Sequence, residues 1–180
     1  MGGMDNDQFL TDILRKGMIY MDGDIDSDMA IRIGKSILWL NAQDDIKEIS
    51  LYINSGGGSV VAGFDIYDII RHSKTPVTGV VYRYANSMAT VVLQACRVRK
   101  ILKHGAMFVH NIKINNAEWH KFEENLEEAL RVPKKNQQEI YEIMAERTGR
   151  SMEEIRNAFR ESKTMCAEEA KEFGLIDEII

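Results

Sequence analysis

Residues 49–71, ISLYINSGGGSVVAGFDIYDIIR, decide the fold of this 180-residue chain. Residues 49–54 are a β-rich run and predict a strand. Three glycines, Gly56 to Gly58, end that strand, and Ser59 is a residue type that caps helix N-termini. We expect the capped helix to continue to about Arg71. The stretch is therefore a strand, a glycine turn and a helix in direct succession.

The same alternation continues on both sides of this unit. Apolar spacing predicts helices over residues 7–16, 26–41 and 87–95, and strands over residues 18–21 and 77–84. Residues 98–102 and 107–109 flank a Lys-His-Gly-Ala turn and predict a β-hairpin. Strands that alternate with helices argue for an α/β core.

The remainder of the chain is charged and helical. Over residues 118–146 the apolar side chains form two stripes, which are Phe122, Leu126 and Leu130, then Ile140, Ile143 and Met144. Pro133 lies between the stripes and should break or kink the helix. Residues 151–154 read as a capping box, and a last short helix over 167–173 should end at Gly174.

The composition excludes several classes of protein. Apolar residues make up 44% of the chain and charged residues 28%, as in ordinary globular proteins. The net charge of −5 argues against a nucleic-acid surface. No apolar run approaches the ~20 residues of a membrane helix, and the start lacks the regions of a signal peptide. Cys96 and Cys166 lack metal-ligand spacing and indicate a reducing compartment. We expect one cytoplasmic domain without metal, cofactor, nucleic acid or membrane.

The glycine triplet has two interpretations. Glycines between a strand and a helix let backbone amides hold an anion, but glycine is also the default residue of a tight turn. The spacing is not GxGxxG and no GK[ST] follows, so neither a dinucleotide fold nor a P-loop is indicated.

Ser87 and His110 are the candidate catalytic pair. Ser87 stands where a strand gives way to a helix, beside the Met88 amide, and there it can serve as a nucleophile or as a structural N-cap. His110 ends the run Met107-Phe108-Val109. It can take a serine proton near neutral pH or simply bond to backbone.

Several stretches together resemble the ClpP peptidase family. INSGGGSVVAGFDIYD (53–68) is similar to the family motif INSPGGxxxAGxxIYD, NSM (86–88) stands at its catalytic ASM, and MFVH (107–110) matches the strand that ends in its catalytic histidine. The tail AEEAKEFGLID (167–177) and the opening GMIYMDGDIDSDMA also resemble the family. The resemblance runs from about residue 8 to the end.

The resemblance implies a fold and roles by position. The fold is the ClpP/crotonase-like ββα superhelix with a helical handle, as one domain over residues 1–180. It divides into an N-terminal segment (1–17), an α/β head (18–112), the handle (113–150) and a C-terminal return to the head (151–180). Ser87 is implied as the nucleophile, His110 as general base and then acid, and the amides of Gly58 and Met88 as the oxyanion hole.

The resemblance also implies partners. These are a polypeptide substrate and further copies of the chain in two stacked rings, joined by handles. A Clp-type ATPase is a candidate partner only, because about 17 residues precede the first predicted strand, whereas relatives typically have a longer segment there.

Three departures from the family pattern bear on the chemistry. The proline of the glycine motif is Gly56 here, and the histidine is followed by Asn111-Ile112 instead of Gln-Pro. The family's catalytic aspartate, five residues before the alanine at Ala167, falls on Ser162. We favour the neighbouring Glu161 as the third catalytic residue and keep Ser162 as the alternative. A further alternative is that His110 has only a neutral partner.

Two other functions remain open from the sequence. One is a weak or inactive ring subunit with a scaffolding role, which would not need the serine, the histidine or the glycines. The other is an acyl-CoA enzyme of the crotonase type, which would use acidic residues instead of a Ser-His pair.

Overall fold

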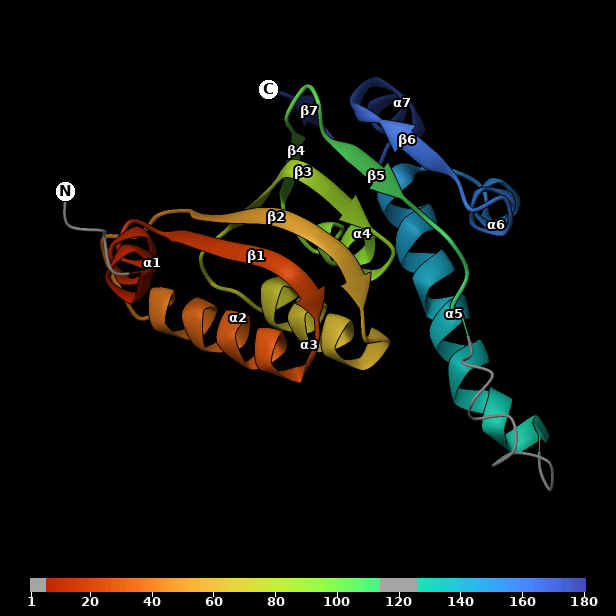
Figure 1. Cartoon of the computed structure of the whole chain (residues 1–180), viewed down its shortest axis with the longest axis horizontal. Coiled ribbons are helices and arrows are strands. Elements are labelled where there is room, and N and C mark those ends of the chain that lie inside the picture. Colours follow the sequence, from red (N-terminus) through yellow and green to blue (C-terminus); the bar gives the residue numbers. More distant parts are fainter. Residues whose placement is uncertain (1–5, 114–125) are drawn as a thin grey trace.

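A computed structural model describes residues 6–113 and 126–180 of the chain (Figure 1). The helices of this part are α1 (Asn6–Leu14), α2 (Ser27–Leu40), α3 (Val60–Arg71), α4 (Met88–Leu93), α5 (Leu126–Thr148), α6 (Met152–Arg160) and α7 (Ala167–Phe173). The strands are β1 (Met18–Ile25), β2 (Ile49–Gly58), β3 (Val77–Asn86), β4 (Val98–Ile101), β5 (Ala106–Phe108), β6 (Thr164–Cys166) and β7 (Glu178–Ile179). The chain therefore has the expected α/β fold, of the ClpP/crotonase-like type.

One mostly parallel sheet organises the molecule. The strand order is β1-β2-β3-β4-β7, and β5 pairs with both β3 and β6. Among the strand pairs of the described residues, only β5–β6 is antiparallel. Helices α2 and α3 cover one face of the sheet (Figure 1). In such sheets the carboxyl ends of parallel strands meet at one edge, where sites form. Gly58, Ser87 and His110 all stand at or just beyond such strand ends.

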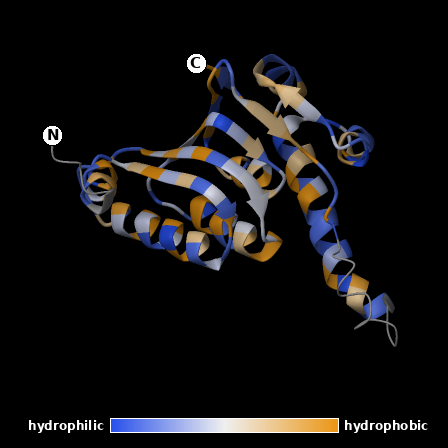
Figure 2. Ribbon diagram, viewed as in Figure 1, coloured by the Kyte–Doolittle hydropathy of each residue, from blue (hydrophilic) through white to orange (hydrophobic). Residues whose placement is uncertain are grey.

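The core forms where the apolar positions of strands and helices meet. Hydrophobic residues recur along β1, β2 and β3 and along α2 and α3 (Figure 2). The largest fully buried side chains include Met21, Ile33, Ile37, Leu51, Ile53 and Ile66. The first half of β3 is buried on both faces and reads as a near-continuous apolar run, whereas buried and partly exposed residues alternate along β2.

The predicted hairpin at residues 98–109 is wrong. Strands β4 and β5 do not pair with each other; both lie parallel to β3, β4 beside its first half and β5 beside its end. Gly105 lies in the connection between them, and a side chain there would approach the backbone oxygen of Leu102 to 3.0 Å. In the sequence, two β runs around a turn look the same whether the two strands pair with each other or both pair with a third strand. Here the ten-residue strand β3 is long enough to pair with both.

Most local signals are confirmed. The Ser59 side chain accepts a hydrogen bond from the Ala62 amide, and Ser151 with Glu154 forms the capping box. Gly174 ends α7 in the left-handed conformation with φ of 91°. Strand β2, however, continues through the glycines to Gly58 instead of ending at Asn54.

Helix α5 continues across Pro133, so the expected break is wrong. A proline inside a helix removes a backbone hydrogen bond and costs about 3 kcal/mol. The C-terminal half of α5 offsets this cost because Ile140 and Met144 are buried in the core. Phe122 and the rest of residues 114–125 lie outside the described part. No helix within residues 6–113 and 126–180 combines the length and apolar character of a membrane crossing.

Candidate active site

Ser87 occupies a strained turn between β3 and α4. Its φ is 53° and its ψ is −122°, a conformation that non-glycine residues avoid and that costs about 1–3 kcal/mol. Its side chain makes no capping hydrogen bond to α4, so the structural alternative for this serine, an N-cap, is not observed. Such strain clusters at functional sites, where a side chain must be held in a fixed direction.

The backbone around Ser87 leaves the Met88 amide without a hydrogen bond among the described residues. Ser87 donates its own N–H to the Phe108 carbonyl oxygen at 2.6 Å, and Thr90 donates its N–H to the Ser87 carbonyl oxygen at 3.0 Å. Among the described residues, no hydrogen bond engages the Met88 amide. Buried backbone N–H groups rarely lack a partner, so this amide is free to donate to a bound group.

Gly57 allows β2 to approach Ser87, and Gly58 allows it to approach Ile25 of β1. Both have positive φ, 95° and 147°. A Cβ at Gly57 would lie 2.8 Å from the Ser87 Cβ, and one at Gly58 would lie 2.3 Å from the Ile25 carbonyl oxygen. Side chains at either position would collide with backbone, so the two glycines are required by close packing rather than by turn flexibility alone.

His110 follows β5 and is held in orientation from two sides. Its ring stacks on Phe108 with centroids 5.1 Å apart. Its Nδ1 lies 2.7 Å from the Asn111 carbonyl oxygen. A carbonyl only accepts, so this contact assigns the proton to Nδ1 and leaves Nε2 as the free base.

One pocket brings the sequence-predicted residues together. It has a volume of about 170 Å³ and is lined by Gly58, Val60, Ser87, Met88, Val91, His110, Ile112, Lys113, Ile140 and Phe159. Within the described residues, Ser87 and His110 make no direct hydrogen bond with each other. The walls are otherwise apolar apart from Lys113, so an apolar side chain fits there.

The two candidates for the third catalytic residue lie differently. Glu161 is exposed, follows α6 and lines another pocket, together with Arg150 and Lys163. The β5–β6 register pairs Phe108 with Thr164, and the bond from the Val109 N–H to the Lys163 oxygen (3.0 Å) extends it by one step.

The next pair along that register would be His110 and Ser162, but β5 ends at Phe108 and β6 begins at Thr164. Ser162 has a φ of 54° and is exposed. Neither its side chain nor that of Glu161 bonds to His110 among the described residues, so the structure pairs no acid with His110.

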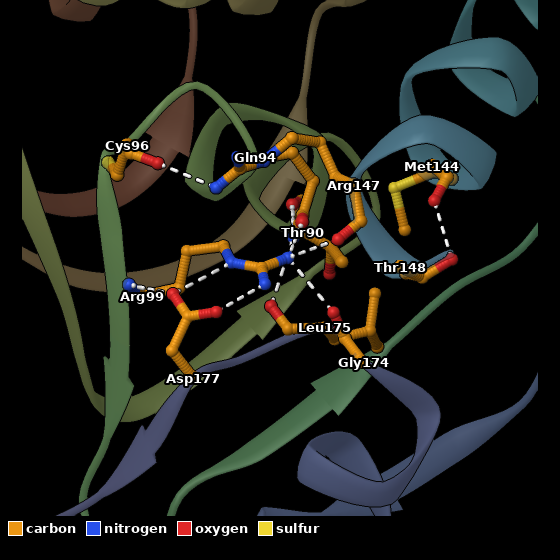
Figure 3. A network of polar contacts seen from close by, with 10 residues as sticks. All are labelled: Thr90, Gln94, Cys96, Arg99, Met144, Arg147, Thr148, Gly174, Leu175 and Asp177. Atoms are coloured by element: carbon orange, nitrogen blue, oxygen red, sulfur yellow. Dashed lines mark hydrogen bonds and ion pairs between the residues drawn. The ribbon is translucent and has the colours of Figure 1, made fainter. Parts of the chain in front are cut away.

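A buried polar network anchors the far end of α4 (Figure 3). Arg99 is only 6% exposed, and its guanidinium donates to both carboxylate oxygens of Asp177, at 3.1 and 2.5 Å, and to Gln94 Oε1 at 2.6 Å. Gln94 caps the C-terminus of α4. The same guanidinium donates to the carbonyl oxygens of Arg147 and Gly174. The helix that Ser87 precedes is thereby joined to α5 and to the C-terminal segment.

The network fixes the charges of its members. Burial raises the pKa of the Asp177 carboxyl, but the hydrogen bonds and charge of Arg99 outweigh burial and leave that pKa below its ordinary value. Burial also raises the pKa of the Cys96 thiol to about 12. Cys96 is therefore a neutral, unreactive core residue rather than a second nucleophile.

Sequence reasoning missed Asn111 as a partner of His110, because the bond uses a backbone carbonyl that every residue possesses. It also missed Arg99. A signal for Arg99 was present. It lies two residues before Ile101 and therefore shares the buried face of β4 with it, and a cation at such a position requires a buried partner.

A comparison with protein families agrees with the fold. The family described as Clp protease matches residues 1–180, the whole chain. The protein therefore belongs to the Clp protease family.

Proposed function

We propose that the protein is a serine endopeptidase that cleaves polypeptides through a Ser-His mechanism. The observation that carries the proposal is the single pocket shared by Ser87, His110, Gly58 and Met88. Family membership supports protease chemistry in general. The strained turn at Ser87 and the free Met88 amide support this assignment of roles.

In the proposed reaction, Ser87 Oγ attacks the peptide carbonyl carbon while His110 Nε2 takes the hydroxyl proton. The negative oxygen that forms accepts hydrogen bonds from the Gly58 and Met88 amides. The C–N bond then breaks, and His110 returns the proton to the leaving amine. Water, activated by the same base, hydrolyses the acyl-serine and restores the enzyme.

The pocket walls support a peptide substrate over an acyl-CoA thioester. None of the residues that line the pocket within the described chain is acidic, whereas the acyl-CoA alternative uses acidic residues as acid or base. Val91, Ile140 and Phe159 favour an apolar side chain of the substrate beside the scissile bond.

One observation favours a second candidate, a weak or inactive ring subunit. His110 Nδ1 bonds to a neutral carbonyl instead of a carboxylate. In a serine protease, the replacement of the triad aspartate by asparagine lowers turnover about 10⁴-fold. On this account the chain keeps the site but works slowly.

Assembly, partners and location complete the proposal. Helix α5 extends away from the head (Figure 1) and carries Val132, which is 49% exposed. A partner copy that covers this helix, in two stacked rings, would remove that apolar surface from water. A Clp-type ATPase remains a candidate partner. The free thiols Cys96 and Cys166 support a cytoplasmic location. Light scattering that finds a stable 20.6 kDa monomer would refute the ring.

The test of catalysis is labelling of Ser87 with a fluorophosphonate, beside hydrolysis of a fluorogenic peptide with an apolar residue before the scissile bond. Labelling in the wild type and its loss in Ser87→Ala and His110→Ala support the peptidase. Labelling with negligible turnover supports the weak subunit. An unlabelled Ser87 in the assembled protein refutes both the nucleophile and the mechanism.

A further inference from the structure

Helix α5 makes two hydrogen bonds to the segment that begins at His110. Tyr141 Oη donates to Asn111 Oδ1 at 2.6 Å, and the Ile112 N–H donates to Gln137 Oε1 at 2.6 Å. Gln137 and Tyr141 are four residues apart, so they share one face of α5. The chain beyond β5 runs along α5 in Figure 1.

Both groups of one peptide unit are used in this contact. The Asn111 carbonyl and the Ile112 N–H belong to the same planar peptide, so the direction of one fixes the direction of the other. Gln137 holds the N–H side, and His110 Nδ1 bonds to the oxygen side at 2.7 Å. A proline at position 112, as in the family pattern, has no N–H and could not make the Gln137 bond.

The two side chains of α5 are themselves fixed. Tyr141 packs edge-on against Phe159 with centroids 5.4 Å apart. Burial raises the pKa of the Tyr141 hydroxyl above 10, so it remains a donor at neutral pH. Gln137 Nε2 is buried without a hydrogen-bond partner among the described residues, which costs about 1–3 kcal/mol. The chain tolerates that cost at Gln137, where the side-chain oxygen of the same amide accepts the hydrogen bond from Ile112.

We propose that Gln137 and Tyr141 are positioning residues that orient His110 through the Asn111–Ile112 peptide. Helix α5 thereby performs part of the task of a triad acid: it fixes the tautomer and direction of the base without a charge. The inference rests on the proposed Ser-His function and names the regulation of that site, because any movement of α5 would move the base.

The experiment compares Gln137→Leu and Tyr141→Phe with two controls in the assembled protein. Gln138→Leu alters the next residue of α5, whose amide bonds to Glu142 and Arg156 instead. Tyr52→Phe removes a hydroxyl that makes no hydrogen bond within the described residues. The readouts are hydrogen exchange over residues 109–113, the rate of fluorophosphonate labelling at Ser87, and kcat and KM for one peptide.

We expect faster exchange at Ile112 in Gln137→Leu. The labelling rate and kcat should be about 10- to 100-fold lower in both variants, less than the roughly 10²- to 10⁴-fold contribution of a general base, because the base itself remains. KM should stay within about twofold, because neither side chain lines the pocket. In a double-mutant cycle, Asn111→Ala should make Tyr141→Phe nearly silent.

The outcomes separate this inference from the function. Labelling and kcat equal to the controls in both variants overturn the positioning role, while wild-type labelling keeps the proposed function. An unlabelled wild type refutes the function. In that case, hydrogen exchange over residues 109–113 that is the same in the variants and the wild type would overturn the proposal that α5 orders this segment. Faster exchange in the variants would support it.

Discussion

The Ser87 backbone amide donates a 2.6 Å hydrogen bond to the Phe108 carbonyl oxygen. This bond joins the turn that carries the proposed nucleophile to the strand that leads to the proposed base, and the Phe108 ring stacks on His110. The two candidate catalytic residues are 23 positions apart in the sequence. One strand end, however, sets the positions of both.

Replacement of Ser87 should separate stability from activity. Both Ser87→Ala and Ser87→Gly remove the hydroxyl and should abolish hydrolysis. Glycine relieves the strain at φ of 53° and ψ of −122°, so Ser87→Gly should be more stable than Ser87→Ala by about 1 kcal/mol. Denaturant titration at matched protein concentration measures the difference. Equal stability would mean that the turn is not strained.

The glycine motif offers a matched pair of variants. Gly57→Ala places a Cβ 2.8 Å from the Asn86 carbonyl oxygen and the Ser87 Cβ, so we expect a loss of about 2 kcal/mol or more and a large loss of turnover. Gly56→Ala meets nothing nearer than Asp24 Oδ1 at 4.0 Å and should be close to neutral. Thermal melts and peptide hydrolysis of both variants provide the check, and equal effects would contradict the close approach.

The third catalytic position can be tested by restoring the family residue. Ser162 has a left-handed φ, which aspartate tolerates better than most residues, and it would face His110 if the β5–β6 register continued two residues beyond the strands. We expect Ser162→Asp to raise kcat by about 10-fold or more, because a carboxylate stabilises the imidazolium. Ser162→Asn is the neutral control and should give no rise.

Glu161→Gln completes this series. Glu161 lines a different pocket, so its replacement should change kcat by less than about twofold. A loss of orders of magnitude in this variant would instead identify Glu161 as the acid, through a movement of the loop after α6.

The Arg99–Asp177 pair should make stability depend on pH. Asp177→Asn removes the charge opposite a buried guanidinium, and we expect a loss of about 2 kcal/mol at pH 7, reduced because the carboxylate is partly exposed. The folded pKa of Asp177 lies below its ordinary 3.8. Its contribution is therefore full above that value and is lost as the pH falls through the lower, folded pKa.

Urea titrations of wild type and Asp177→Asn from pH 7 downward measure this effect. The two proteins should converge in stability only in strong acid. Lys100 on β4 forms an ion pair with the exposed Glu178 on the neighbouring strand β7. Glu178→Gln is the control, and it should lower the free energy of unfolding little at any pH.

The local features of this fold were readable in the sequence because neighbouring residues cause them. Ser59, the capping box at Ser151 and the C-terminal Gly174 each satisfy backbone groups within a few positions.

Pairing between distant segments was not readable. Two β runs around a turn predicted a β4–β5 hairpin, yet both strands pair with β3. Strand pairing depends on which strand edges are still unpaired in the folded sheet. Helix α5 continues across Pro133 because burial of Ile140 and Met144 offsets the cost of the proline. The sequence shows the proline but not this burial.

The sequence by itself determined the α/β class, the caps and the identity of Ser87, His110 and the glycines as one group. Only the tertiary structure decided how His110 is oriented and which groups hold α4. The Asn111 carbonyl is a backbone group without a sequence signature, and Arg99 meets Asp177 across 78 residues. Such contacts depend on how the whole chain closes, whereas caps and turns depend on a few adjacent residues.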